Sequence, residues 1–279
     1  MKVLHEAGLF RVRACRGAVL AYPTTDAHVG RALDAYGEWA FAELELLGAL
    51  LAPGDVAVDV GANLGTHAVA FAQRVGPAGV VYAFEPQRVM HQLLCTNATL
   101  NGLTWLKALH AAVGAAPGAL KVPDIDYAAG GNFGGLRLGS WAEGETVPVF
   151  TLDALGLSRC ALLKIDVEGM EAQVLDGARA LLAGCRPIVY LEHNQPGGAP
   201  EVLDRLLGHG YRCFWHFSPF FRPDNFAGAT LDLFHGLVDA NVIAVSPALA
   251  AGLTALEPVS GREDTAAAAL ERRQARRQG

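Results

Sequence analysis

An aspartate and two glycines stand where an apolar segment gives way to an amphipathic one. The stretch VAVDVGANLGTHAVAFAQRV, residues 56–75, carries Asp59 inside the apolar run and Gly61 and Gly65 in the turn that follows. A strand that ends in glycines and feeds a helix brings backbone N–H groups close to a small ligand. The G-x-x-x-G spacing differs from the dinucleotide fingerprint and from a phosphate loop. Because the carboxylate of Asp59 would repel a phosphate and attract a cation, the turn is predicted to hold a ligand without phosphate.

A second acid follows at the end of the next apolar run, GVVYAFEP, where Glu85 comes 26 residues after Asp59. An acid at the tip of the strand after a glycine turn suits the two hydroxyls of a ribose. S-adenosylmethionine (SAM) has a ribose, an ammonium group and a positive sulfur but no phosphate, so it fits both acids. The alternative is a generic α/β domain whose strand-end acids are merely solvated.

Two later segments place proton-accepting side chains at strand ends. The segment CALLKIDVEG gives Asp166 and Glu168, which share a face if the segment is extended. Two acids in one site raise the pKa of one of them, which suits a general base. The segment RPIVYLEHN gives Glu192, His193 and Asn194, and histidine is the side chain whose ordinary pKa lies nearest 7.

Each of these residues also has a structural interpretation. Glu168 can stabilise the first turn of the following helix, Asp166 can pair with Lys164, and His193 can bond to nearby backbone. His67 starts a helix and is expected to pack, although contact with the cofactor is an alternative. Asp166, Glu192, His193 and Asn194 are metal-ligand types, but they lack tight ligand spacing, so no metal is predicted.

The elements that would position these residues alternate between strands and helices from about residue 54 to 246, which predicts a parallel sheet covered on both faces. Residues 114–150 form an insertion with short strands near 119–122 and 145–150, and residues 218–240 form a second irregular segment. We expect a hairpin and helix cap over 1–50, the main domain over 51–250, and a helical or mobile tail over 251–279.

Composition narrows the class of protein. Hydrophobic residues make up 52% of the 279 residues and the net charge is −6, which argues against a nucleic-acid or anionic-membrane partner. The five cysteines form no CxxC pair, which favours a reducing compartment. No signal peptide or membrane-length apolar run occurs, so a soluble cytoplasmic protein is expected. The arginines of the tail ERRQARRQG are interpreted as a solvated helix end.

The segments DVGANLGTH, AFEPQ and LLKIDVEGMEAQVLDGA resemble the FkbM family of SAM-dependent methyltransferases, and so do NFGGLRL and FWHFSPFFRPDNFAG. The similarity covers about residues 28–246. It implies a Rossmann-like class I methyltransferase fold, with a seven-stranded, mostly parallel sheet whose last strand is antiparallel. It further implies O-methylation of a hydroxyl on a sugar, polyketide or other natural product, with S-adenosylhomocysteine (SAH) as the product. N-methylation of an amide or amine, such as a peptide side chain, is the alternative.

The resemblance also implies site residues. Those expected to bind the cofactor are Glu38, Asp59, Gly61, Ala62, Asn63, Gly65, Thr66, Glu85, Pro86 and Asp166. Gln87 is expected at the adenosine edge. Independently of the resemblance, the aromatic and amide side chains expected to bind the acceptor are Asn132, Phe133, Asn194, Trp215, His216, Phe220 and Asn225, and residues 128–138 are expected to act as a lid. Asp166, Glu168, Glu192 and His193 remain the catalytic candidates.

Two other functions stay open at this point. A nicotinamide-dependent oxidoreductase could use a related sheet, although the missing G-x-G-x-x-G disfavours it. The second open function is that of a protein that binds the cofactor without catalysing a reaction. The N-terminal hairpin and helix could form a homodimer contact.

Overall fold

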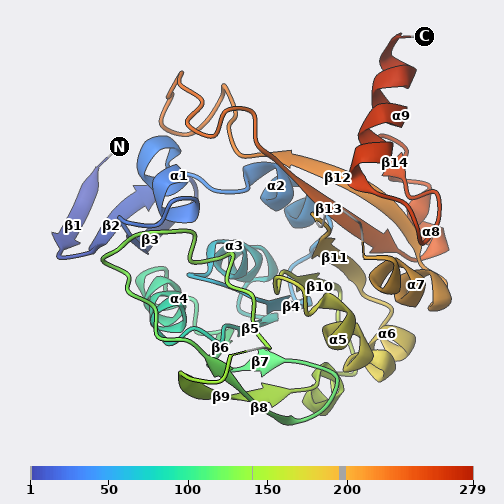
Figure 1. Ribbon diagram of the computed structural model, residues 1–279, viewed down its shortest axis with the longest axis horizontal. Coiled ribbons are helices and arrows are strands. Elements are labelled where there is room, and N and C mark those ends of the chain that lie inside the picture. The colour runs from blue at the N-terminus through green and yellow to red at the C-terminus, as the bar shows by residue number, and fades with distance from the viewer. Residues whose placement is uncertain (1, 140, 195–198, 279) are drawn as a thin grey trace.

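The computed structural model describes residues 2–139, 141–194 and 199–278 (Figure 1). Its centre is an eight-stranded sheet in the order β14-β12-β13-β11-β10-β4-β5-β6. The strands are β4 (Val56–Val60), β5 (Val80–Phe84), β6 (Leu106–Leu109), β10 (Leu162–Ile165), β11 (Ile188–Glu192), β12 (Arg212–Pro219), β13 (Val238–Val245) and β14 (Glu257–Pro258).

The sheet is mostly parallel. Strands β6, β5, β4, β10 and β11 pair in parallel, and β13 is antiparallel to both β11 and β12. The sequence predicted seven strands. The eighth is the short β14, which the C-terminal segment adds antiparallel to the edge of β12.

Helices cover both faces of the sheet, as the continuous apolar strands predicted (Figure 1). One face packs against α3 (Thr66–Val75) and α4 (Arg88–Leu100), and the other against α5 (Glu171–Asp176), α6 (Arg179–Gly184) and α7 (Pro200–Gly208). The chain forms two short helices, α5 and α6, between residues 171 and 184. At the break, a Cβ on Gly177 would lie 2.1 Å from the carbonyl oxygen of Gly114, so the backbones touch there.

The N-terminal segment forms a separate three-stranded antiparallel sheet of β1 (Val3–Ala7), β2 (Phe10–Cys15) and β3 (Ala18–Pro23). The predicted hairpin is β2–β3, and β1 extends it. The predicted helix is α2 (Phe41–Ala49), preceded by α1 (Val29–Tyr36), which we had not predicted. Leu20 and Tyr22 of β3 share a core with Phe71 of α3. The division of the chain at residue 50 therefore stays a prediction.

The insertion contains the two expected strands, β8 (Gly118–Val122) and β9 (Glu145–Phe150), which pair with β7 (Ala112–Val113) in a small sheet. The 3-10 helix η1 (Leu152–Leu155) follows. Between β8 and β9 the chain returns to the segment after β3. The Thr25 hydroxyl donates to the carbonyl of Tyr127, and the Ala27 N–H donates to the carbonyl of Gly131. The insertion thereby covers the carboxyl end of the central sheet.

The C-terminal segment contains α8 (Pro247–Ala250) and α9 (Ala266–Gln278). Arg272 of α9 binds Asp264 at 2.7 Å and Glu257 at 3.0 Å, while the indole N–H of Trp215 donates to Asp264. Part of the arginine-rich tail is thus docked on β12 rather than fully solvated. In the described part of the chain, no helix has the length and apolar character needed to cross a membrane.

Candidate active site

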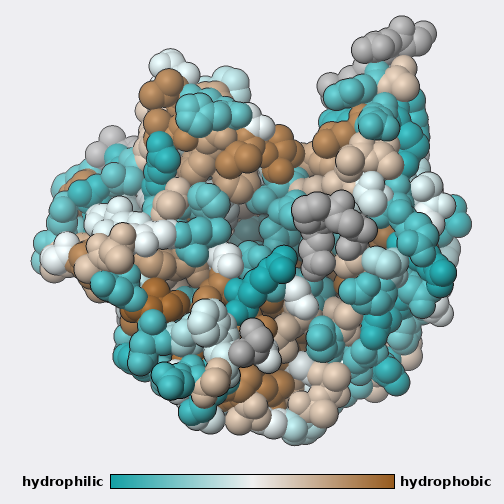
Figure 2. Space-filling view, in the orientation of Figure 1, coloured by the Kyte–Doolittle hydropathy of each residue, from teal (hydrophilic) through white to brown (hydrophobic). Residues whose placement is uncertain are grey.

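A cavity of about 380 Å³ opens at the carboxyl ends of β4, β5, β10 and β11. Figure 2 shows it as a hollow near the middle of the visible face. Ligands of open α/β sheets bind at this edge. Besides these strand ends, the cavity is lined by α1, the start of α3, the insertion and the segment after β12.

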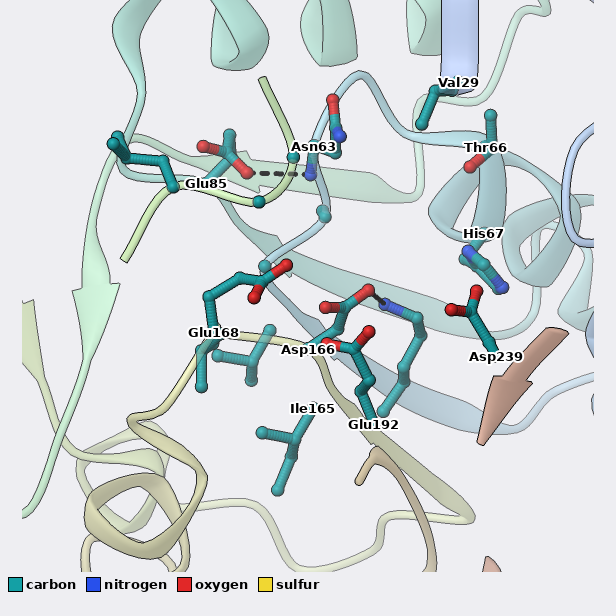
Figure 3. Close-up of a pocket in the computed structure, with 18 of the residues that line it drawn as sticks. Val29, Asn63, Thr66, His67, Glu85, Ile165, Asp166, Glu168, Glu192 and Asp239 are labelled. Atoms are coloured by element: carbon teal, nitrogen blue, oxygen red, sulfur yellow. Dashed lines mark hydrogen bonds and ion pairs between the residues drawn. The ribbon is translucent and has the colours of Figure 1, made fainter. Parts of the chain in front are cut away.

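The alternation of side chains along each strand decides which groups face this cavity. On β10, Leu163 and Ile165 enter one core while Lys164 and Asp166 point to the opposite face. The same alternation places Glu192, Asp239 and Asn241 on the cavity face. Figure 3 shows the resulting arrangement, with Glu85 and Asn63 on one side, Asp166 and Glu192 in the middle, and His67 and Asp239 on the other side.

The glycine turn wraps closely around the neighbouring strand. Gly61 has φ +78°, and a Cβ there would lie 1.7 Å from the carbonyl oxygen of Asp166. Asn63 also has a positive φ, and Gly65 precedes the first residue of α3. Only glycine fits at Gly61, because the turn must pass directly against the backbone after β10.

Glu85 holds the turn from the adjacent strand. Its carboxylate accepts hydrogen bonds from the N–H of Asn63 at 2.7 Å and from the N–H of Gln87 at 2.8 Å. Burial raises the pKa of Glu85 to about 7, against the lowering effect of these two hydrogen bonds. Each carboxylate oxygen keeps a further lone pair, so Glu85 can accept from two ribose hydroxyls as well.

A buried lysine joins two of the acids. The Lys164 ammonium lies 3.3 Å from a carboxylate oxygen of Asp59 and 3.3 Å from one of Asp166. Burial alone would lower the pKa of Lys164, but these carboxylates raise it above its ordinary value. Asp59 is fully buried and does not line the cavity. Its charge therefore balances Lys164 beneath the site, which differs from the direct ligand contact that was expected.

Further carboxylates gather at the middle of the cavity. Oxygens of Asp166, Glu168 and Glu192 all lie within 4.8 Å of one another. Burial and the neighbouring acids raise the pKa of Glu168 to about 7 and that of Glu192 well above its ordinary range. Such a cluster attracts a cation. Oxygen ligands of this kind can also hold a divalent metal ion.

Asn194 links two of the acids across the seam between β11 and β13. Its amide N–H group donates to Glu192 at 2.6 Å and to Asp239 at 3.0 Å, while its amide oxygen accepts from the N–H of Ala240 at 2.6 Å. Burial raises the pKa of Asp239 to about 8. The strand β13 starts earlier than the sequence indicated, and Asp239 was therefore missed.

The structure brings many of the predicted residues to one cavity. Those that line it are Gly61, Ala62, Asn63, Thr66, Glu85, Pro86, Gln87, Asn132, Asp166, Glu168, Glu192, Asn194 and Phe220. Those that do not are Glu38, Asp59, Gly65, Phe133, His193, Trp215, His216 and Asn225.

His193 and Trp215 lie on the wrong face of the sheet for a role at the cavity. His193 is one residue beyond Glu192, so its side chain points to the opposite face. There it packs against Trp215 at a ring distance of 5.4 Å, and its Nε2 accepts from the N–H of Ala199. The assignment of His193 as a catalytic base and of Trp215 as an acceptor contact is corrected accordingly.

Replacing His193 with alanine is therefore expected to affect stability rather than catalysis. The lost packing and the unpartnered N–H of Ala199 should lower the free energy of unfolding by about 1–3 kcal/mol. Urea unfolding measures that loss, and SAH release at saturating substrates measures turnover. A large fall in turnover of the folded variant would contradict this placement.

Other expected contacts support the walls instead of facing the ligand. Glu38 binds Arg16 at 2.6 Å and accepts from the N–H of Phe226, while Asn225 bonds within its own loop. Phe133 is buried, and its carbonyl accepts from the Gln87 side chain. His216 bonds to the Tyr190 hydroxyl at 2.9 Å.

Gly65 also belongs to this supporting group. A Cβ on Gly65 would lie 2.6 Å from Leu94 Cδ1. Gly65 therefore permits the packing of the turn against α4, and its role is structural.

The cavity residues that were not assigned a role from the sequence include Trp39, Glu43, Asp239 and Asn241. Glu43 is an acid in the first turn of α2, a common place for a capping acid, so its type and position gave no functional signal. His67, expected chiefly to pack, also lines the cavity.

Comparison with known proteins identifies the family of the chain. The family model described as "Methyltransferase FkbM domain" matches residues 59–213. The chain is 31% identical to the 31-O-demethyl-FK506 methyltransferase FkbM of Streptomyces tacrolimicus, over 62% of this chain and 79% of that protein. It is 30% identical to methyltransferase sdnD of Sordaria araneosa, over 54% of this chain and 70% of that protein.

A solved methyltransferase FkbM from Methylobacillus flagellatus is 16% identical, with a TM-score of 0.42, over 71% of this chain and 45% of that one. The chain thus spans less than half of that structure's length.

The family match and the Streptomyces relative identify a SAM-dependent methyltransferase. The chain belongs to the FkbM methyltransferase family.

Proposed function

We propose that this enzyme transfers the methyl group of SAM to a hydroxyl of a small natural product, such as a sugar or polyketide. The observation that carries the proposal is one cavity with a ribose-type carboxylate at one end and a carboxylate cluster at its middle. The Streptomyces tacrolimicus relative is a 31-O-demethyl-FK506 methyltransferase, which supports oxygen as the acceptor atom.

In the proposed arrangement, the SAM ribose binds Glu85 and the methionine chain crosses the turn at Gly61. The sulfonium then faces Asp166 and Glu192, and the negative charge of the Asp166 carboxylate favours a cation. Apolar lining from Ala111 to Val113 would receive the adenine ring. The long axis of the cofactor would follow the row of carboxylates from Glu85 to Glu192.

The acceptor would enter from the side of Asn194 and Asp239. Trp39, Phe220 and Leu237 add apolar surface to that part of the cavity. Trp39 and Phe220 contact each other edge to face at a ring distance of 4.8 Å. Aromatic walls with a few polar groups suit the face of a sugar or a polyketide ring.

Methyl transfer is an in-line displacement. The acceptor oxygen forms a bond to the methyl carbon while the carbon–sulfur bond breaks and its electrons neutralise the sulfonium. Holding oxygen, carbon and sulfur on one line supplies much of the rate. A hydroxyl acceptor also has to lose its proton to a base within hydrogen-bond reach.

The direct test is incubation of the enzyme with SAM and a panel of hydroxylated and amine-bearing natural products. SAH release with a mass gain of one methyl group on a hydroxylated compound is the expected result. Methylation confined to amines would favour the N-methylation alternative. SAM binding without SAH release on any acceptor would favour a cofactor-binding protein without catalysis.

Removal of divalent metal is expected to leave turnover unchanged within error. Lys164 already supplies a positive charge beside Asp166, and Asn194 occupies one oxygen of Glu192. The measurement is SAH release before and after dialysis against EDTA. Loss of turnover that Mg²⁺ restores would instead assign Asp166, Glu168 and Glu192 to a metal site.

A further inference from the structure

A buried chain of three polar side chains ends at the cavity. The amide N–H group of Asn241 donates to Glu43 Oε1 at 3.2 Å, and Glu43 Oε2 lies 3.1 Å from His67 Nε2. All three residues line the cavity and are buried in the protein. They come from β13, α2 and α3, so the fold rather than local sequence brings them together.

This chain fixes the histidine. With Glu43 accepting from Asn241, its second oxygen is directed at His67 Nε2, which favours the tautomer that carries a proton on Nε2. The other ring nitrogen, Nδ1, then presents a lone pair. In the part of the chain that the structure describes, no side chain or backbone group bonds to Nδ1. The ring is further held against Phe71 at a centroid distance of 5.9 Å.

We propose that His67 is the general base of methyl transfer and that Glu43 is its positioning residue. The inference rests on the proposed function. As the acceptor oxygen bonds to the methyl carbon, its proton passes to Nδ1 of His67. The carbon–sulfur bond breaks with its electron pair on sulfur, leaving SAH, and the imidazolium is stabilised by the Glu43 carboxylate. The proton then returns to water.

The arrangement follows the logic of a base oriented by a buried carboxylate. Burying a carboxylate such as that of Glu43 is costly compared with packing apolar side chains of similar size. The pair therefore adds little to stability by itself, whereas it equips the cavity wall with a proton acceptor.

The carboxylates of the cavity are less suited to this step. Asp166 is held by the Lys164 ammonium. Burial raises the pKa of Asp239 to about 8 and that of Glu192 further still, so both tend to hold protons at neutral pH. Glu168 follows β10 in a segment with positive φ, and within the described residues no hydrogen bond orients its carboxylate.

The test compares His67→Gln with wild-type protein on the acceptor that the wild type methylates. Glutamine places an amide nitrogen near the position of Nε2, so it can keep the bond to Glu43 while lacking Nδ1. We expect kcat at saturating substrates to fall by about 10²–10⁴-fold. We expect the Kd of SAM, measured by calorimetry, to stay close to the wild-type value.

Two further variants keep the proposal falsifiable. In His67→Gly, added imidazole should restore part of the turnover, which a purely structural residue would not show. Glu43→Gln should lower kcat without a matching change in the Kd of SAM. The matched control is His91→Asn, because His91 is a half-buried helix histidine that stacks on His110 outside the cavity.

An unchanged kcat in folded His67→Gln protein would overturn the proposal while leaving methyl transfer itself established. A weakened Kd for SAM with normal kcat at saturation would also overturn it, because His67 would then hold the cofactor. Failure of the proposed function looks different, since wild-type protein would then methylate no hydroxyl in the panel.

Discussion

Gly61→Ala is expected to abolish SAM binding and to destabilise the fold by more than about 4 kcal/mol. The added Cβ would lie 1.7 Å from the carbonyl oxygen of Asp166 and 2.8 Å from its carbonyl carbon. Both atoms belong to backbone, so no side-chain rotation relieves the clash. Because β4 pairs with β10 at this point, either the strands must separate or the turn must leave the cavity. Thermal unfolding and SAM titration measure the two effects.

Gly156→Ala is the matched control. Gly156 also has a left-handed backbone, with φ +59°, but a Cβ there meets nothing within 4 Å. Its replacement carries only the backbone strain, about 1–2 kcal/mol. The control should bind SAM with wild-type affinity. If Gly61→Ala behaved like this control, the close approach of the turn to β10 would be wrong.

Glu85→Ala is expected to raise the Kd of SAM by about 10²–10⁴-fold. Two charge-assisted hydrogen bonds to the ribose would be lost, each contributing about 1.5–3 kcal/mol. The variant also removes the acceptor for the N–H groups of Asn63 and Gln87, so the turn loses its support. Calorimetric titration of SAM measures the loss, and circular dichroism shows whether the variant remains folded.

Two variants refine this result. Glu85→Gln keeps the shape but turns an amide N–H group toward a backbone N–H, so its affinity should fall between alanine and wild type. Glu145→Ala removes an acid that pairs with Arg88 at the surface, and it should bind SAM normally. Wild-type affinity in Glu85→Ala would remove Glu85 from the ribose role.

The sequence predicted the mostly parallel sheet and its helices because their patterns are local. Valine-rich runs bounded by glycine and proline mark buried strands, and the glycine turn marks the first crossover. The short strands of the insertion were also located correctly. The two-residue strand β14 escaped prediction because it is stabilised by docking against β12, which no local pattern reveals.

The site was only partly predictable for the same reason. Glu85, Asp166 and Glu192 end strands, so their place at the cavity follows from the sheet. His193 differs from Glu192 by one position, and the alternation along the strand reverses its direction. The contact between Glu43 and His67 depends on how α2 packs beside α3, so no spacing in the sequence indicates it.

The central claim is that this cavity holds the sulfur nucleoside of a methyl donor. A crystal structure of the wild-type protein soaked with SAH tests it most directly. We expect ribose hydroxyls within hydrogen-bond distance of the Glu85 carboxylate and the sulfur facing Asp166 and Glu192. SAH bound elsewhere, or a dinucleotide seated on Glu85 in its place, would contradict the account.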